Sequence, residues 1–179
     1  MDLIYYYLPA LETIRDFMDL GGNVLFVIGF LTLFMWMLIL ERLFYLRTGH
    51  KKMAAKTIML WEARGDHKSW NAHQIRTRLI SQVSSQVERN IPLIQTCVAL
   101  CPLLGLLGTV TGMVEVFEVM AISGSGNPRS MAGGVSKATI PTMAGMVAAL
   151  SGVAMATYLQ RKASRERELL ADNLYVGDK

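Results

Sequence analysis

Three long stretches of this 179-residue chain carry no charged residue, and they constrain its fold more than any other feature. They cover residues 21–40, 95–114 and 138–160. A helix of about 20 apolar residues spans the roughly 30 Å hydrocarbon layer of a membrane. A core helix of a small soluble protein is usually shorter and keeps one polar face. We therefore predict an all-α membrane protein with three transmembrane helices.

The distribution of Lys and Arg predicts which ends of these helices face the cytoplasm. Basic residues are concentrated in residues 41–92 and after residue 160. The charged residues of 1–20 are mainly acidic, and residues 121–134 contain one arginine. Because basic residues beside short spans stay in the cytoplasm, we expect the N-terminus outside and the C-terminus inside. This arrangement accounts for the net charge of +4, so nucleic-acid binding is not needed to explain it.

The pattern of apolar and polar residues divides this one membrane domain into consecutive segments. An amphipathic stripe near the N-terminus suits a helix in the outer interface, or equally an extension of the first span. Since no basic region precedes the first span, we expect an anchor and no cleavable signal. The predicted segments are 1–23 (N-terminal interfacial helix), 24–40 (first span), 41–94 (cytoplasmic helical segment), 95–120 (second span), 121–135 (outer loop), 136–160 (third span) and 161–179 (cytoplasmic helical tail).

Within the cytoplasmic segment, helical patterning breaks near Gly65 and Asp66. A glycine between two periodic stretches is typical of a turn. We therefore predict a helical hairpin at 41–94, with its second arm running straight into the second span.

Small residues mark one face of the second span and one face of the third. Helices in lipid approach closely where side chains are small. The small residues are Pro102, Gly105 and Gly112 in the second span, and Gly145, Ala149 and Gly152 in the third. Thr109 and Thr142 lie on the same faces, at a similar depth if the outer hairpin is symmetric. Their hydroxyls are candidates for lining one ion path, and the alternative is that each bonds the carbonyl one turn back and serves packing alone.

The second and third spans lack an ionisable proton carrier. Residues 95–114 and 138–160 contain no Asp, Glu, His or Lys. A hydroxyl relays or solvates a proton but does not hold charge near neutral pH. If protons cross the membrane here, a partner must supply the carboxylate.

The second span contains the motif PLLGLLGTVTGMVEVF from Pro102, and the third contains VSKATIPTMAGMVAAL from Val135. These two motifs resemble the family of ExbB, TolQ and MotA, the inner-membrane proton-channel subunits of bacterial energy-transducing motors, and ExbB most of all. The three-span layout with the N-terminus outside is similar as well. The resemblance implies a multi-pass protein of the bacterial inner membrane, in which a homo-pentamer encloses a pore. That pore holds a dimer of an ExbD-like single-span partner, which carries the missing aspartate.

The resemblance also implies residue roles and a function. Thr109 and Thr142 match the family's pore threonines beside the partner aspartate. Protons would be translocated without a cofactor, and their energy would pass to a TonB-like protein that opens outer-membrane receptors for iron-siderophores. Two alternatives stay open, namely a TolQ-like role in outer-membrane constriction and an oligomeric scaffold that conducts no ions.

Lys137, at the outer start of the third span, departs from the family pattern, which often has glutamate there. The hairpin register places it near Glu115 and Glu118, so one hypothesis is an ion pair with either carboxylate. The alternative is that the lysine snorkels to the outer interface. Either interpretation keeps the ammonium at the outer surface of the membrane.

Basic residues at the inner ends of the first and third spans are candidate phospholipid anchors. They are Arg42, Arg161, Lys162 and Arg165. The inner leaflet is anionic and attracts such clusters. Lipid contact at these positions is therefore predicted.

The sequence offers no catalytic residue and no metal site. Cys97 and Cys101 are one helical turn apart, do not readily bridge within one helix, and are expected to pack as small residues. His50, His67 and His73 have no cysteine near them and are expected on the surface. No nucleophile motif, phosphate loop or paired-carboxylate arrangement is present. We therefore do not expect an enzyme.

Overall fold

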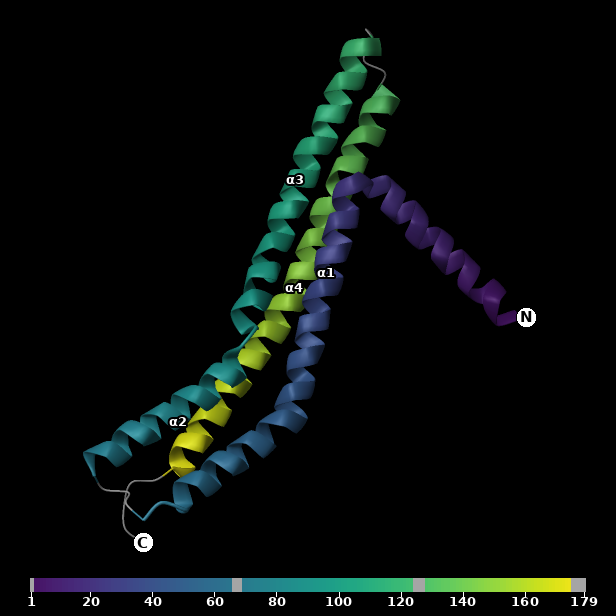
Figure 1. Cartoon of the computed structure of the whole chain (residues 1–179). Coiled ribbons are helices and arrows are strands. Elements are labelled where there is room, and N and C mark those ends of the chain that lie inside the picture. The colour runs from purple at the N-terminus through teal and green to yellow at the C-terminus, as the bar shows by residue number, and fades with distance from the viewer. Residues whose placement is uncertain (1, 66–68, 124–127, 175–179) are drawn as a thin grey trace. The chain divides into compact units, whose positions relative to one another are not determined.

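The computed structural model describes the backbone of residues 2–65, 69–123 and 128–174, and the side chains of 17–18, 21–49, 53–65, 69–122, 133–135 and 137–174. Its helices are α1 (Asp2–Glu62), α2 (Trp70–Glu88), α3 (Ile91–Ser123) and α4 (Pro128–Asn173) (Figure 1). Every regular element in these backbone ranges is a helix. Three segments are long and apolar enough to cross a membrane, Gly21–Glu62, Trp70–Ile122 and Gly133–Asn173. The predicted all-α class and its three apolar helices are confirmed.

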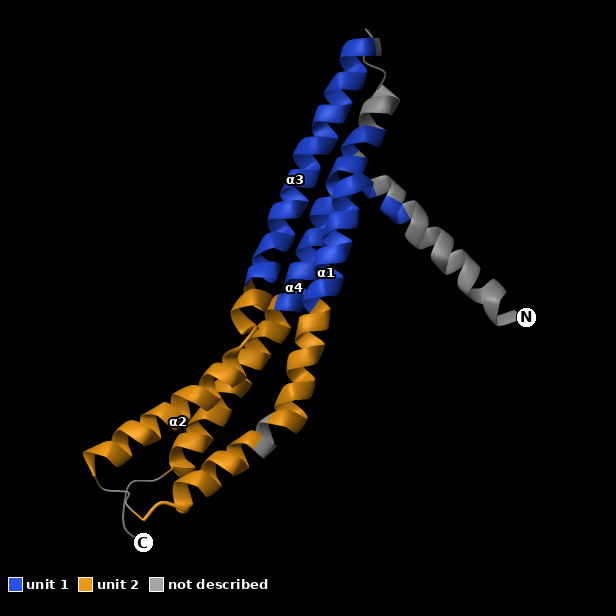
Figure 2. Cartoon of the chain, viewed as in Figure 1, with its two compact units in different colours: residues 1–35, 96–152 blue, residues 36–95, 153–179 orange. Residues whose placement is uncertain are grey.

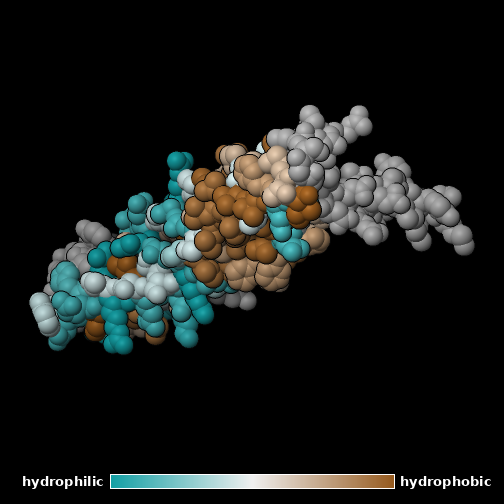
Figure 3. Space-filling view, turned by 90° about the horizontal axis from the view of Figure 1, so that it is seen from above, coloured by the Kyte–Doolittle hydropathy of each residue, from teal (hydrophilic) through white to brown (hydrophobic). Residues whose placement is uncertain are grey.

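The helices form two compact units (Figure 2). Unit 1 contains residues 1–35 and 96–152, and unit 2 contains residues 36–95 and 153–179. Large apolar side chains on unit 1 are exposed, among them Phe30, Leu103 and Leu150. Apolar and polar side chains gather in separate areas of the surface (Figure 3). Because soluble monomers rarely expose apolar areas of this kind, the surface of unit 1 fits lipid or partner helices.

Glycines set the distance between α3 and α4 in unit 1. A Cβ built on Gly105 would lie 2.9 Å from Thr142 Cα, and one built on Gly145 would lie 2.5 Å from the Cys101 carbonyl oxygen. Both neighbours are backbone atoms, so only a residue without a Cβ permits this approach. The small-residue face therefore packs α3 against α4 within one chain.

α1 is interrupted at Gly22, where the ribbon turns (Figure 1). This residue has φ 64° and ψ −165°, a backbone conformation that is essentially restricted to glycine. The turn lies near the end of the segment 1–23 that was predicted as an interfacial helix, just before the first span. Of the predicted amphipathic stripe, Ile4, Tyr7, Leu11 and Ile14 lie outside the described side chains, and Met18 is half-buried.

Gly22→Ala is expected to lower the free energy of unfolding by about 1–3 kcal/mol, because alanine is strained in this conformation. Nothing lies within 4 Å of a Cβ built at this position, so the effect is conformational and not a clash. Denaturant titration in mild detergent measures it. Gly29→Ala in the same helix is the control, since its Cβ would meet only one atom, at an ordinary 3.8 Å. Equal stability of the two variants would contradict the strain argument.

The helix boundaries correct two predictions about the connections. α3 continues to Ser123 and α4 begins at Pro128, so much of the predicted loop 121–135 is helical. Proline suits the first helical turn because its missing N–H has no acceptor there and its φ is preset. The predicted straight run into the second span is wrong, since α2 ends at Glu88 and α3 begins at Ile91. Asn90 lies between them with φ 66°, a region that asparagine tolerates better than most residues.

In unit 2, Arg76 holds the end of α4 against α2. Its Nε donates to the Leu174 carbonyl at 2.5 Å, and its Nη2 donates to the Ala171 carbonyl at 2.8 Å. The last carbonyls of a helix have no donor within the helix, and the guanidinium also complements the negative end of the helix dipole. The segment predicted as a tail is thus helical through Asn173 and packs on α2.

Arg76→Ala is expected to loosen the last turns of α4. Hydrogen bonds from a charged donor contribute about 1.5–3 kcal/mol, so opening of this end becomes roughly ten- to a hundredfold more frequent. Amide hydrogen exchange of residues 168–174 measures the opening. Arg78→Ala removes an exposed arginine of the same helix and should leave the exchange unchanged. Equal protection in the two variants would show that Arg76 does not hold the helix end.

Candidate functional site

Thr109 and Thr142 meet at one turn of α3 in unit 1. Thr142 of α4 donates its Oγ1 hydrogen to the Gly105 carbonyl at 2.7 Å. Thr109 donates to the next carbonyl of α3, that of Leu106, also at 2.7 Å. Both side chains are half-buried. The structure therefore brings the two candidate path residues into one layer of the α3–α4 pair.

The two hydroxyls differ in where their hydrogen bonds go. The bond of Thr109 stays within its own helix, as the packing alternative expects, whereas the bond of Thr142 crosses from α4 to α3. A hydroxyl donates one hydrogen and keeps two acceptor lone pairs. Each threonine therefore retains the capacity to accept a hydrogen bond from water, from a hydrated proton or from a protonated carboxyl group.

The residues predicted to pack the pore helices surround this layer. All are buried or half-buried: Pro102, Gly105, Gly112, Gly145, Ala149 and Gly152. Gly112 approaches Ala138, and Gly152 approaches Met35 of α1. Ala149 packs in a buried cluster with Cys101. These contacts lie within one chain and hold α3 and α4 in the packing that brings the two threonines together.

Other polar groups give no sign of a metal centre. Among the residues that the structure describes, no three His, Cys, Asp or Glu side chains lie together in a way that would hold a metal ion. Cys97 and Cys101 are buried free thiols. His73 is exposed, and the side chains of His50 and His67 lie outside the described residues.

In unit 1, Lys137 of α4 lies close to Glu115 of α3. The ammonium lies 3.6 Å from the Glu115 Oε2, with the lysine side chain 44% and the glutamate side chain 63% exposed. Glu118, the other candidate, is exposed. An ion pair this exposed contributes only about 0–1 kcal/mol.

Lys137→Glu is expected to lower the free energy of unfolding by about 0.5–1 kcal/mol, because it replaces an attraction by a repulsion. Adding Glu115→Lys should recover the loss, since the swapped charges attract again. Denaturant titration of the two single variants and the double variant in detergent completes the cycle. The pairing hypothesis fails if Lys137→Glu raises stability or if the swap recovers nothing.

The candidate lipid anchors differ in exposure. Arg161 and Arg165 are exposed and Lys162 is half-buried, whereas Arg42 is only 3% exposed. The Arg42 Nη1 donates to the Gln86 carbonyl at 3.1 Å, in the last turn of α2. The guanidinium of Arg42 therefore binds protein in this structure, which corrects its assignment as a lipid anchor. The reason is that the last carbonyls of α2 need a donor and favour a cation.

The sequence pattern did not reveal a polar cluster in unit 2. Gln95 Nε2 donates to Gln160 Oε1 at 3.2 Å. Nearby on α2, Glu88 Oε1 accepts a hydrogen bond from Ser84 at 3.1 Å and lies 3.8 Å from Arg167 Nη1. In the sequence, the two glutamines only mark ends of charge-free stretches. Their contact was not predictable, because 65 residues separate them along the chain.

Comparison with known proteins finds a family that covers most of this chain. A model of the MotA/TolQ/ExbB proton channel family matches residues 45–172. "Putative biopolymer transport protein ExbB-like 1" of Synechocystis sp. is 36% identical over 90 residues, which are 49% of this chain and 35% of that protein. "Biopolymer transport protein exbB1" of Vibrio cholerae serotype O1 is 44% identical over 78 residues, 42% of this chain and 34% of that protein.

The matched region is only part of these relatives, because the chain spans little more than a third of their length. The family model, by contrast, matches more than half of the chain and includes α2, α3 and nearly all of α4. The resemblance seen in the two sequence motifs is thus confirmed. The chain belongs to the MotA/TolQ/ExbB proton channel family.

Proposed function

We propose that this chain is the stator and proton-channel subunit of a motor in the bacterial inner membrane that is driven by the proton motive force. The observation that carries the proposal is the layer of two threonine hydroxyls on glycine-packed helices. One hydroxyl bridges α4 to α3 and the other lies beside it on the next carbonyl of α3. Membership of a proton channel family supports the proton as the ion.

A partner completes the path, because α3 and α4 have no carboxylate between residues 95 and 114 or 138 and 160. We propose an ExbD-like single-span partner, present as a dimer inside a homo-pentamer of this chain, with its aspartate beside Thr109 and Thr142. Exposed apolar side chains next to the threonine layer support an assembly. Leu106 is 59% and Val110 55% exposed in the single chain.

The energy of proton flow would move the partner and act on a TonB-like protein that opens outer-membrane receptors for iron-siderophores or similar nutrients. The relatives are named as biopolymer transport proteins, which supports a role in driving transport. One proton crossing at about 100 mV releases roughly 2.3 kcal/mol, so useful force requires several crossings or tight coupling. Phospholipids would contact the exposed Arg161 and Arg165, just after the charge-free stretch of α4.

Co-expression with the single-span partner tests the proposal. Native mass spectrometry in mild detergent is expected to give five copies of this chain with two of the partner. Vesicles containing both chains should acidify inside when a potassium gradient with valinomycin makes the interior negative. Vesicles with this chain alone, or with the partner's membrane aspartate changed to asparagine, should not. A small oligomer that never retains the partner and never conducts would instead assign a scaffold role and overturn the proposal.

A further inference from the structure

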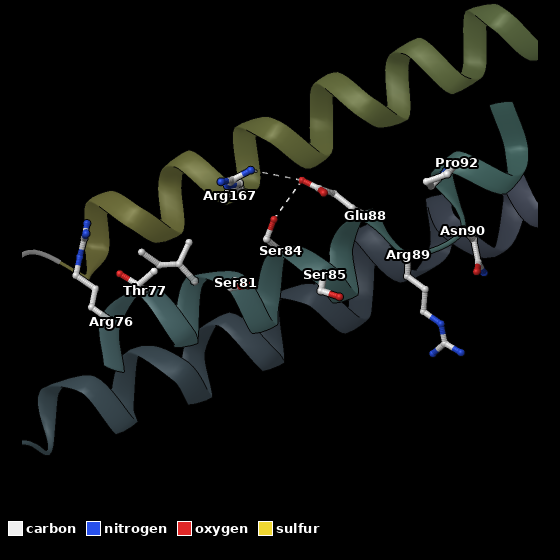
Figure 4. A pocket seen from close by; sticks show the side chains of 11 residues that line it. Arg76, Thr77, Ser81, Ser84, Ser85, Glu88, Arg89, Asn90, Pro92 and Arg167 are labelled. Carbon is white, nitrogen blue, oxygen red and sulfur yellow. Dashed lines mark hydrogen bonds and ion pairs between the residues drawn. The ribbon is translucent and has the colours of Figure 1, made fainter. Parts of the chain in front are cut away.

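Glu88 lines two cavities of unit 2. The larger, of about 780 Å³, lies along α2 and α4 and includes Ser84 and Arg167, whose side chains point toward the Glu88 carboxylate (Figure 4). The smaller, of about 190 Å³, reaches from Glu88 to Gln95 and Gln160. At about 30 Å³ for each water, the smaller cavity has room for several waters. Glu88 is therefore placed where the two cavities meet.

The smaller cavity lies at the inner ends of the charge-free stretches of α3 and α4. Gln95 begins the charge-free stretch of α3, Gln160 ends that of α4, and the two side chains are hydrogen-bonded at 3.2 Å. This is the end flanked by basic residues, which the sequence predicts to be cytoplasmic. Because the charge-free stretches end at these two glutamines along the sequence, a proton path that follows the stretches would end beside the glutamine pair.

Of the charged side chains that line the cavities, Glu88 can accept that proton and the arginines cannot. Among the described residues that line them, Glu88 is the one carboxylate, and the cations are Arg76, Arg89 and Arg167. An arginine stays charged and accepts no proton. Arg76 is bonded to carbonyls at the end of α4, and Arg167 lies 3.8 Å from Glu88.

Charged side chains of α1 also lie near the end of α2, where they contact Asn90 and Gln86 rather than Glu88. Glu41 Oε2 accepts a hydrogen bond from Asn90 at 3.0 Å, and Arg42 donates to the Gln86 carbonyl. Both contacts of Glu88 fall on Oε1, where Ser84 donates at 3.1 Å and Arg167 lies nearby. These two contacts to Oε1 therefore orient the Glu88 carboxylate.

We propose that Glu88 is the proton-release group at the inner mouth of the channel. It takes a proton from a hydronium ion beside Gln95 and Gln160, which leaves water behind, and then gives the proton to water in the larger cavity. Only O–H bonds form and break, and the carboxylate is regenerated in each cycle. The inference rests on the proposed function, since it assigns a step of the same proton path.

Glu88→Gln tests the assignment in vesicles that contain the full chain and its single-span partner. Glutamine keeps the size of the side chain and the hydrogen bond to Ser84 but accepts no proton. We expect proton flux to fall about tenfold, less than the loss of about a hundredfold or more typical of an enclosed proton-transfer group, because Glu88 is half exposed and water competes. Glu168→Gln is the matched control, since Glu168 is exposed on α4 and lines neither cavity.

Glu88→His separates proton transfer from a structural role. Histidine titrates near neutral pH, so flux should recover in part and depend on the internal pH between about 6 and 7. Native mass spectrometry should find the same assembly in all variants, because an exposed ion pair contributes little to stability. A flat pH profile in Glu88→His, together with loss of assembly in Glu88→Gln, would assign a structural role and overturn the inference.

The failure of this inference is distinguishable from failure of the proposed function. If the wild-type chain with its partner conducts no protons, the proposed function itself fails. If the wild-type chain conducts and Glu88→Gln conducts as well as Glu168→Gln, the channel stands and the role of Glu88 is refuted.

Discussion

Gly145→Ala is expected to lower the free energy of unfolding by about 1–3 kcal/mol, as overpacking of a tight interior does. The added Cβ would lie 2.5 Å from the Cys101 carbonyl oxygen and 3.3 Å from Gly105 Cα. Both atoms belong to the backbone of α3, so neither rotates away and the two helices must separate. Separation would also lengthen the 2.7 Å hydrogen bond from Thr142 to the Gly105 carbonyl. The variant is therefore expected to lose proton flux as well as stability.

Denaturant titration of the chain in mild detergent measures this effect, and Gly133→Ala is the matched control on the same helix. Nothing lies within 4 Å of a Cβ built on Gly133. Alanine favours a helix over glycine by about 1 kcal/mol, so Gly133→Ala should leave the chain as stable as before or more stable. If both substitutions shift the unfolding midpoint alike, the close approach of α3 and α4 at Gly145 does not limit stability.

Thr142→Val is expected to reduce proton flux by about ten- to a hundredfold while the assembly persists. Valine has nearly the shape of threonine but no hydroxyl, so it neither bridges to the Gly105 carbonyl nor accepts a hydrogen bond from a passing proton carrier. Hydrogen bonds to charged groups contribute about 1.5–3 kcal/mol, which corresponds to this loss in rate. A hydrogen bond between membrane helices contributes only about 0.6 kcal/mol on average, so stability should change far less.

Two further variants separate the hydroxyl's role in the path from packing. Thr142→Ser keeps the hydroxyl and should keep most of the flux. Thr111→Val removes an exposed hydroxyl that bonds the Leu107 and Gly108 carbonyls of its own helix, each at 3.1 Å, and should leave the flux unchanged. Vesicles that contain both chains report the rate of internal acidification. Normal flux in Thr142→Val, or an equal loss in Thr111→Val, would remove Thr142 from the proposed path.

The membrane helices and the threonine layer were predictable because they depend on short-range regularities. A spanning segment must satisfy its backbone hydrogen bonds internally, so an uncharged run of sufficient length becomes a helix in lipid. Glycines at steps of three and four residues share one helix face, and this spacing placed Thr109 and Thr142 on the face where α3 meets α4. The helical continuation of α4 to Asn173 followed from charge patterning without a breaker.

Connections and partners of charged side chains were harder to predict. The break at Asn90 depends on a single backbone conformation with positive φ, which an asparagine permits but does not dictate. Arg42 looked like a lipid anchor because it ends a span, and only the position of the last turn of α2 shows that its guanidinium has a carbonyl to bind. The start of α4 at Pro128 shows the same ambiguity, because a proline near glycines suits a loop as well as the first turn of a helix.

For this chain, the sequence alone determined the all-α class, the three apolar helices, the family and the face on which the threonines lie. The class, the helices and the face follow from composition and from the 3.6-residue period within one helix, whereas the family follows from the resemblance of two motifs. The tertiary structure decided which side chains meet across helices: Lys137 with Glu115, Gln95 with Gln160, and Glu88 at the junction of two cavities. Such contacts depend on how each helix is rotated and shifted against its neighbour, and packing between residues far apart in the chain sets that register.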